Sequence, residues 1–208
     1  MIRVLLAIKH RMCSEAVAMV LSKEQDLKIV AVASNGPEVL QKIAKTKPDA
    51  AVLAWFLPLL NGLETTRRIA TLGTRPHVIL LTDGDTHITG VQELRAGVRA
   101  LVSFQTPVSD LPNIIRQVAG GFTFLGLNSS ALLAAAILDP HPRRGLSARE
   151  RQVLQLTAEG HSIKQTGAIL GISFKTANYH RTSLMKKLDI QDVATLTRYA
   201  IRERIIDL

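Results

Sequence analysis

The chain has 208 residues, enough for one large domain or two small ones, and its 47% hydrophobic content predicts a globular protein with at least one sizeable core. Its formal net charge of +9 at pH 7 favours a polyanionic partner such as nucleic acid. The single cysteine, Cys13, excludes an intramolecular disulfide, and no apolar stretch reaches the roughly 18 residues that a membrane span needs. We therefore expect a cytoplasmic protein in which Cys13 has a packing role.

Residues 1–125 alternate short apolar runs with helical patterns. The first run, from Ile2 to Ala7, is rich in branched residues and has the length of a buried parallel strand. Further strands are predicted at residues 28–33, 50–53, 78–81 and 100–102. Helices are predicted at residues 16–21, 38–45 and 111–119, and after Asn61-Gly62.

These repeated βα units predict an α/β domain built on a doubly wound, five-stranded parallel sheet with helices on both faces. Sheets of this kind bind ligands at the carboxyl ends of their strands. The residues in the loops that follow the first, third, fourth and fifth predicted strands therefore decide whether this domain can bind a ligand or catalyse a reaction.

A linker separates two predicted domains. Residues 129–138 form an Ala/Leu-rich helical pattern, and residues 139–145 contain two prolines, a glycine and adjacent charges, which is typical of a linker. We accordingly expect a first domain at residues 1–125, a linker with a short helix at 126–145, and an all-α second domain at 146–208.

Helix starts in the second domain are marked by capping residues. Ser147 with Glu150, and Ser162 with Gln165, each fit a capping box, in which two side chains satisfy amides at the start of a helix. Gly160 ends the first of these helices as a C′ glycine. The spacing predicts two consecutive helices, of which the second is short.

A third helix follows a tight turn. Gly171 makes the turn, and Ser173 can cap a helix that runs to about Leu188. Two helices joined by a short glycine-containing turn have the spacing of a helix-turn-helix. Ala177, Leu184 and Leu188 share one face of the third helix and should lie in the core.

The polar side chains outside this apolar face are candidate contacts to duplex DNA. Asn178 can bond adenine bidentately, lysine and arginine neutralise phosphates, and Arg181 is expected to extend outward from the apolar face. The twelve basic and seven acidic side chains after residue 125 agree with this interpretation; an ordinary solvated face is the alternative. The candidate DNA-binding residues are Lys164, Lys175, Thr176, Asn178, Tyr179, Arg181, Thr182 and Lys186.

The second domain carries a family resemblance. The segments 146–154, 160–165, 170–180 and 187–188 resemble the LuxR-type DNA-binding domain in their residues and in their spacing. That resemblance implies a four-helix domain whose third helix enters the major groove, usually as a dimer on paired half-sites. It also implies a fourth helix at about Asp192 to Glu203, where the dimer contact commonly forms.

Two candidate contacts depart from the pattern of that family. By motif position, Lys175, Asn178, Tyr179 and Thr182 stand where such proteins contact DNA. Asn178 and Thr182 occupy positions that are often basic in the family. The departure concerns individual base contacts and leaves the predicted fold unchanged.

The first domain resembles the receiver domain of response regulators of the NarL/FixJ class, which join a receiver to a LuxR-type domain. The resemblance rests on Pro48-Asp49, on Pro58-x-x-Asn61-Gly62-Leu63-Glu64, on Leu81-Thr82 and on Arg95-Ala96-Gly97-Val98-Arg99-Ala100. It implies a flavodoxin-like receiver sheet and a role in a two-component system, and it extends over the whole chain.

The residues that would perform receiver chemistry are replaced. Aspartyl phosphorylation requires an acceptor carboxylate, a Mg²⁺ held by further carboxylates, and a cation that offsets the phosphoryl charge. Where the family has paired acidic residues this chain has Ile8 and Lys9, where it has the acceptor there is Ala54, and where it has a lysine there is Phe104. Only the hydroxyl of Thr82 remains, so we expect a degenerate pocket without phosphoacceptor or metal.

Two interpretations of this altered pocket stay open. The replaced residues can simply be core, or they can form a site for a small molecule or a protein. Trp55-Phe56-Leu57, directly after the third predicted strand, could instead be an exposed apolar contact.

The sequence thus predicts a sequence-specific transcription regulator that binds double-stranded DNA as a homodimer, independently of aspartyl phosphorylation, and that uses no cofactor. The alternatives are a protein-interaction adaptor that uses the degenerate receiver, and a regulator controlled by a small ligand in the altered pocket. A flavodoxin-like enzyme is disfavoured because the chain lacks both a phosphate-cradling glycine loop and a carboxylate cluster.

Overall fold

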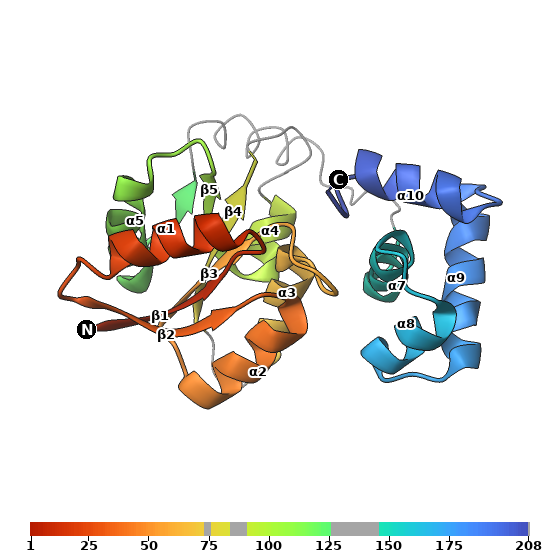
Figure 1. The fold of residues 1–208 in the computed structure, drawn as a ribbon, viewed down its shortest axis with the longest axis horizontal. Coiled ribbons are helices and arrows are strands. Elements are labelled where there is room, and N and C mark those ends of the chain that lie inside the picture. Colours follow the sequence, from red (N-terminus) through yellow and green to blue (C-terminus); the bar gives the residue numbers. More distant parts are fainter. Residues whose placement is uncertain (73–75, 84–90, 126–145, 208) are drawn as a thin grey trace. The chain divides into compact units, whose positions relative to one another are not determined.

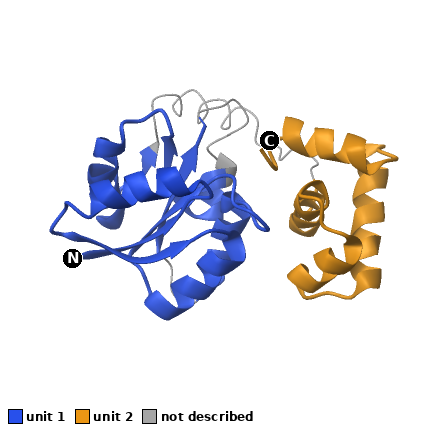
Figure 2. Ribbon diagram, in the orientation of Figure 1, with its two compact units in different colours: residues 1–140 blue, residues 141–208 orange. Residues whose placement is uncertain are grey.

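The structure, a computed structural model, describes residues 1–72, 76–83, 91–125 and 146–207. Contacts divide the chain into two compact units, residues 1–140 and 141–208, each considered by itself (Figure 2). The predicted helix at 129–138 and the predicted linker around it lie outside the described residues. Within the described part of the chain, no helix is both long and apolar enough to cross a membrane.

The first unit is built on a parallel sheet with the strand order β2-β1-β3-β4-β5-β6. The five predicted strands are confirmed, and a sixth strand of two residues, too short to leave a sequence pattern, extends the sheet beyond β5. All five residues of the central strand β3 are buried, as its continuous apolar run predicts. The strands are β1 (Ile2–Ala7), β2 (Leu27–Ala33), β3 (Ala50–Ala54), β4 (His77–Thr82), β5 (Val98–Ser103) and β6 (Phe124–Leu125).

Helices cover both faces of this sheet, which confirms the doubly wound fold. Figure 1 shows α1 and α5 on one face and the neighbouring helices α2, α3 and α4 on the other. Asn35 and Asn61 cap α2 and α3 by accepting amide hydrogen bonds from Glu38 and Glu64. The sequence pattern did not predict the short helix α4. The helices are α1 (Arg11–Leu21), α2 (Gly36–Thr46), α3 (Gly62–Ile69), α4 (Val91–Ala96) and α5 (Leu111–Ala119), with a 3₁₀ turn, Val108–Asp110, before α5.

The second unit consists of α7 (Ala148–Ala158), α8 (Ile163–Leu170), α9 (Phe174–Leu188) and α10 (Val193–Arg202). Both predicted capping boxes are present, at the starts of α7 and α8. Asp192 caps α10, which begins and ends within one residue of the predicted fourth helix. A separate apolar core, including Val153, Leu154, Leu184 and Leu196, holds the four helices together.

Candidate functional site

The helix α9 has one buried face and one exposed face. Ala177 and Leu184 are fully buried, whereas Leu188, predicted to be core, is only half-buried at the edge of that core. Ser173 caps the helix, because its hydroxyl accepts the Thr176 amide at 3.0 Å. The core contacts therefore fix which side chains of α9 face solvent.

The candidate DNA contacts differ in exposure. Tyr179 is 69% exposed, and five other candidates are also exposed. Asn178 and Arg181 are half-buried, and an Arg181 guanidinium nitrogen donates to the Asn178 side-chain oxygen at 3.3 Å. The amide nitrogen of Asn178 takes no part in that bond. The other exposed candidates are Lys164, Lys175, Thr176, Thr182 and Lys186.

The turn between α8 and α9 depends on two glycines. Gly171 has a φ of +64°, in the left-handed region that favours glycine. The Ile172 amide donates to the Gly167 carbonyl at 2.9 Å, and a Cβ at Gly167 would lie 3.0 Å from the Ile172 carbonyl oxygen. These contacts keep the turn short and bring the two helices of the helix-turn-helix close together.

Glu150 connects α7 to α9. Its buried carboxylate accepts hydrogen bonds from the Ser147 amide at 2.8 Å, the Ser183 hydroxyl at 3.0 Å and the Lys187 ammonium at 2.8 Å. Burial raises the pKa of Glu150, but the hydrogen bonds from Lys187, Ser147 and Ser183 outweigh it and lower the pKa to about 2. Glu150 thus stays ionised and holds α9 against α7.

The neighbouring Arg149 makes a second connection from α7. Its guanidinium donates to the Leu170 carbonyl at the end of α8, at 2.9 Å, and to the Gln152 side chain at 3.0 Å. Sequence reasoning identified Glu150 only as a capping partner and did not predict these supports. Ser183 and Lys187 lie more than thirty residues away along the chain, so no local pattern links them to Glu150.

The predicted pocket residues lie at the carboxyl edge of the receiver sheet. Ile8, directly after β1, and Ala54, the last residue of β3, are 3% and 4% exposed, and Thr82 on β4 is 5% exposed. Lys9 is exposed, and Phe104, after β5, is 42% exposed. The predicted pocket residues therefore separate into a buried group and two exposed side chains.

Carboxylates do not gather at this edge in the described residues. Asp49 lies at the opposite end of the sheet, where it accepts the Arg3 amide at 2.7 Å, and Asp83 is exposed. Asp85, which also follows β4, lies outside the described residues. Within the described ranges, no group of three His, Cys, Asp or Glu side chains is placed to hold a metal ion.

The suggestion that Trp55-Phe56-Leu57 forms an exposed contact is wrong. Leu57 is only 2% exposed, and Trp55 is half-buried and packs against the core. The backbone explains this, because the Trp55 amide donates to the Leu81 carbonyl and the Gly62 amide donates to the Trp55 carbonyl, both at 2.8 Å. The segment is therefore held between β4 and the start of α3.

Two family models match the chain. The response regulator receiver domain matches residues 4–116, and the bacterial regulatory proteins of the luxR family match residues 144–200. The oxygen regulatory protein NreC of Staphylococcus haemolyticus is 27% identical over 215 residues, which cover 99% of each chain. NreC of Staphylococcus aureus is 26% identical over the same span.

Solved structures have the same two-part architecture. The response regulator ChrA of a heme-sensing two-component system is 28% identical, with a TM-score of 0.53 over 99% of this chain and 98% of that one. RcsB of Salmonella typhimurium is 21% identical, with a TM-score of 0.67 over 95% and 96% of the two chains. The likeness to RcsB concerns the fold.

Proposed function

Because the chain belongs to the response regulators that join a receiver domain to a LuxR-type DNA-binding domain, we propose that it binds specific duplex DNA through α9 without aspartyl phosphorylation. The observation that carries the DNA interface is the exposed polar face of α9, beside its fully buried Ala177 and Leu184. Lysine and hydroxyl side chains on that face, Tyr179 included, suit phosphates, and Asn178 suits a base edge.

A homodimer on double-stranded DNA forms part of the proposal. Structures of the similar regulator RcsB are described as bound to a promoter, and as two dimers bound to two parallel DNAs. Two copies of this chain would present two copies of α9 to paired half-sites. The fourth helix, α10, is the proposed contact between them, following the family pattern.

Independence from phosphorylation rests on the side chain at the end of β3. The Ala54 side chain has no oxygen that could accept a phosphoryl group, and the Ile8 side chain, directly after the neighbouring strand β1, cannot hold Mg²⁺. Burying a phosphoryl group beside these apolar side chains would leave its charge uncompensated. The degenerate receiver is thus proposed to stay in one state in the presence of phosphodonors.

The test treats the full-length chain with acetyl phosphate and Mg²⁺, then measures intact mass and DNA affinity by gel shift. We expect no gain of a phosphoryl mass and less than about a twofold change in affinity, because no acceptor carboxylate follows β3. A response regulator with an intact acceptor serves as the positive control. A phosphoaspartate accompanied by tighter DNA binding would contradict the proposal.

A further inference from the structure

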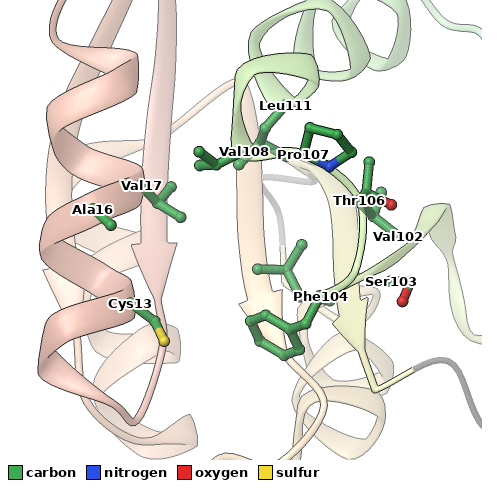
Figure 3. Close-up of a pocket in the computed structure, with 11 residues that line it drawn as sticks. Cys13, Ala16, Val17, Val102, Ser103, Phe104, Thr106, Pro107, Val108 and Leu111 are labelled. Carbon is green, nitrogen blue, oxygen red and sulfur yellow. The ribbon is translucent and has the colours of Figure 1, made fainter.

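A pocket of about 170 Å³ opens in the receiver domain between α1 and the loop that follows β5 (Figure 3). Cys13 and Val17 line it from α1, Phe104 lines it from the loop after β5, and Leu111 lines it from the start of α5. In Figure 3 the Cys13 sulfur and the Val17 side chain point from α1 toward the opposite wall. Phe104 stands where the family has a lysine, so this substitution supplies part of the apolar wall.

The pocket reaches the core of the domain. Leu81, Val102 and Leu111 line it and are each only 4% exposed, and Val17 is 7% exposed. Among the described residues that line it, none is charged, and the polar side chains are the hydroxyls of Thr106 and Ser103, of which Ser103 accepts the Gln105 amide at 3.1 Å. A charged or strongly polar occupant would lose its hydrogen bonds to water and gain few here.

We propose that this pocket binds a compact, uncharged, apolar molecule of about the size of one aromatic ring. The volume of the pocket is close to that of an enclosed apolar protein cavity of about 150 Å³ that accepts benzene or xenon, and its lining is likewise mostly apolar, although this pocket opens to solvent. Phe104 and Val108, which are 42% and 41% exposed, would lose apolar surface to the ligand. A protein partner would need contacts over about 800 Å² per side, far beyond this pocket.

Fluorobenzene is the probe for the test, added to the full-length protein and followed by ¹⁹F NMR. We expect its resonance to broaden and shift in a saturable way. The only cysteine of the chain gives a second readout, because a ligand in the pocket covers the Cys13 sulfur. Alkylation by iodoacetamide, measured by mass, should slow about tenfold at a ligand concentration of about ten times its Kd.

A matched pair of variants tests the location. Cys13→Phe fills the pocket and should abolish the ¹⁹F effects, whereas Cys13→Ala keeps the space open and should retain them. Thermal melting of both variants checks that the receiver domain is folded. Absence of saturable binding by the wild-type chain, or unchanged binding by a folded Cys13→Phe variant, would overturn the inference.

The experiment also distinguishes ligand binding from self-association of the chain. If two copies of the chain cover the pocket, alkylation of Cys13 slows with rising protein concentration and without the probe, and this result would also reject the ligand. The readouts report on the receiver domain directly. The test therefore stands whether or not the proposal on DNA binding holds.

Discussion

Glu150 shows how much of the DNA-binding unit depends on one residue. Its carboxylate satisfies the start of α7 through the Ser147 amide and reaches α9 through Ser183 and Lys187. A buried carboxylate stabilises the contact between helices when hydrogen bonds satisfy both of its oxygens. Removing the carboxylate leaves its former donors without an acceptor. The position of α9 is thus set by a residue outside the helix-turn-helix.

The pH dependence of stability should report this role. The pKa of Glu150 is lowered to about 2 in the folded state, so its stabilising contribution is full above its ordinary value of 4.5 and is lost as the pH falls toward 2. We expect Glu150→Gln to lower the free energy of unfolding by about 1–3 kcal/mol at pH 7 and by much less near pH 3. Denaturant unfolding at both pH values measures the difference.

The control for this experiment is Glu203→Gln, since Glu203 is an exposed residue that directly follows α10. Its loss should change stability by less than about 0.5 kcal/mol at either pH. If Glu150→Gln lowered the free energy of unfolding equally at both pH values, the charge of Glu150 would not be the source of its stabilising effect.

Two residues of α9 should separate base contacts from phosphate contacts. Asn178→Ala should weaken binding to the preferred sequence by about 1–3 kcal/mol and relax sequence preference, because an amide can pair with adenine. Lys175→Ala should weaken binding to all sequences alike, because a lysine at the helix start meets phosphate. Affinities for a preferred and a scrambled site decide this, and equal effects of both substitutions would mean that the roles are wrongly assigned.

At the scale of elements, the start of α3 lies close to the end of β3 at the carboxyl edge of the receiver sheet. A Cβ on Gly62, the first residue of α3, would lie 2.4 Å from the Ala54 carbonyl oxygen. The backbone therefore occupies the space beside Ala54, and the residue there is buried. This close approach explains why the edge is packed at Ala54, which is 4% exposed.

Gly62→Ala should accordingly destabilise the receiver domain by about 3 kcal/mol or more, since the collision involves backbone atoms that cannot move independently. Gly121→Ala provides the comparison. Gly121 has a φ of +91° with open space around it, so only its backbone conformation opposes the change, at about 1 kcal/mol. Thermal unfolding of the two variants measures both effects. A milder effect of Gly62→Ala would indicate that α3 shifts away from β3.

At the scale of the whole molecule, charge governs association with DNA. The chain carries a net charge of +9, and four of the candidate contacts are cationic: Lys164, Lys175, Arg181 and Lys186. Each phosphate contact releases counterions, so DNA affinity falls as salt rises. An adaptor that does not bind DNA would have no such dependence.

A salt series on the preferred DNA therefore distinguishes these functions. If the four cations each meet one phosphate, the logarithm of the association constant should fall with the logarithm of salt concentration with a slope of about −4 per bound protomer. Lys186→Ala should reduce the slope by about 1. If Lys186 faces away from DNA, its substitution would leave the slope unchanged. A wild-type chain whose DNA affinity does not depend on salt would favour the adaptor.

Much of the fold was predictable because its signals are local. Branched apolar runs marked the five main strands, and serine–glutamate or serine–glutamine pairs marked the starts of α7 and α8. The six-residue α4 and two-residue β6 escaped prediction, because such short elements form only with support from the rest of the sheet and its helices. The exposure of Trp55 was misjudged for a similar reason, since distant backbone bonds hold it.

The apolar identity of Ala54 and the set of polar residues on α9 follow from the sequence by itself, because they depend on residue identity and helical spacing. Only the tertiary structure decided that Ile8 and Ala54 are buried, that Phe104 and Cys13 line one pocket, and that Glu150 supports α9. Such contacts join segments that are far apart along the chain. Their burial and charge pairing arise when the elements pack together.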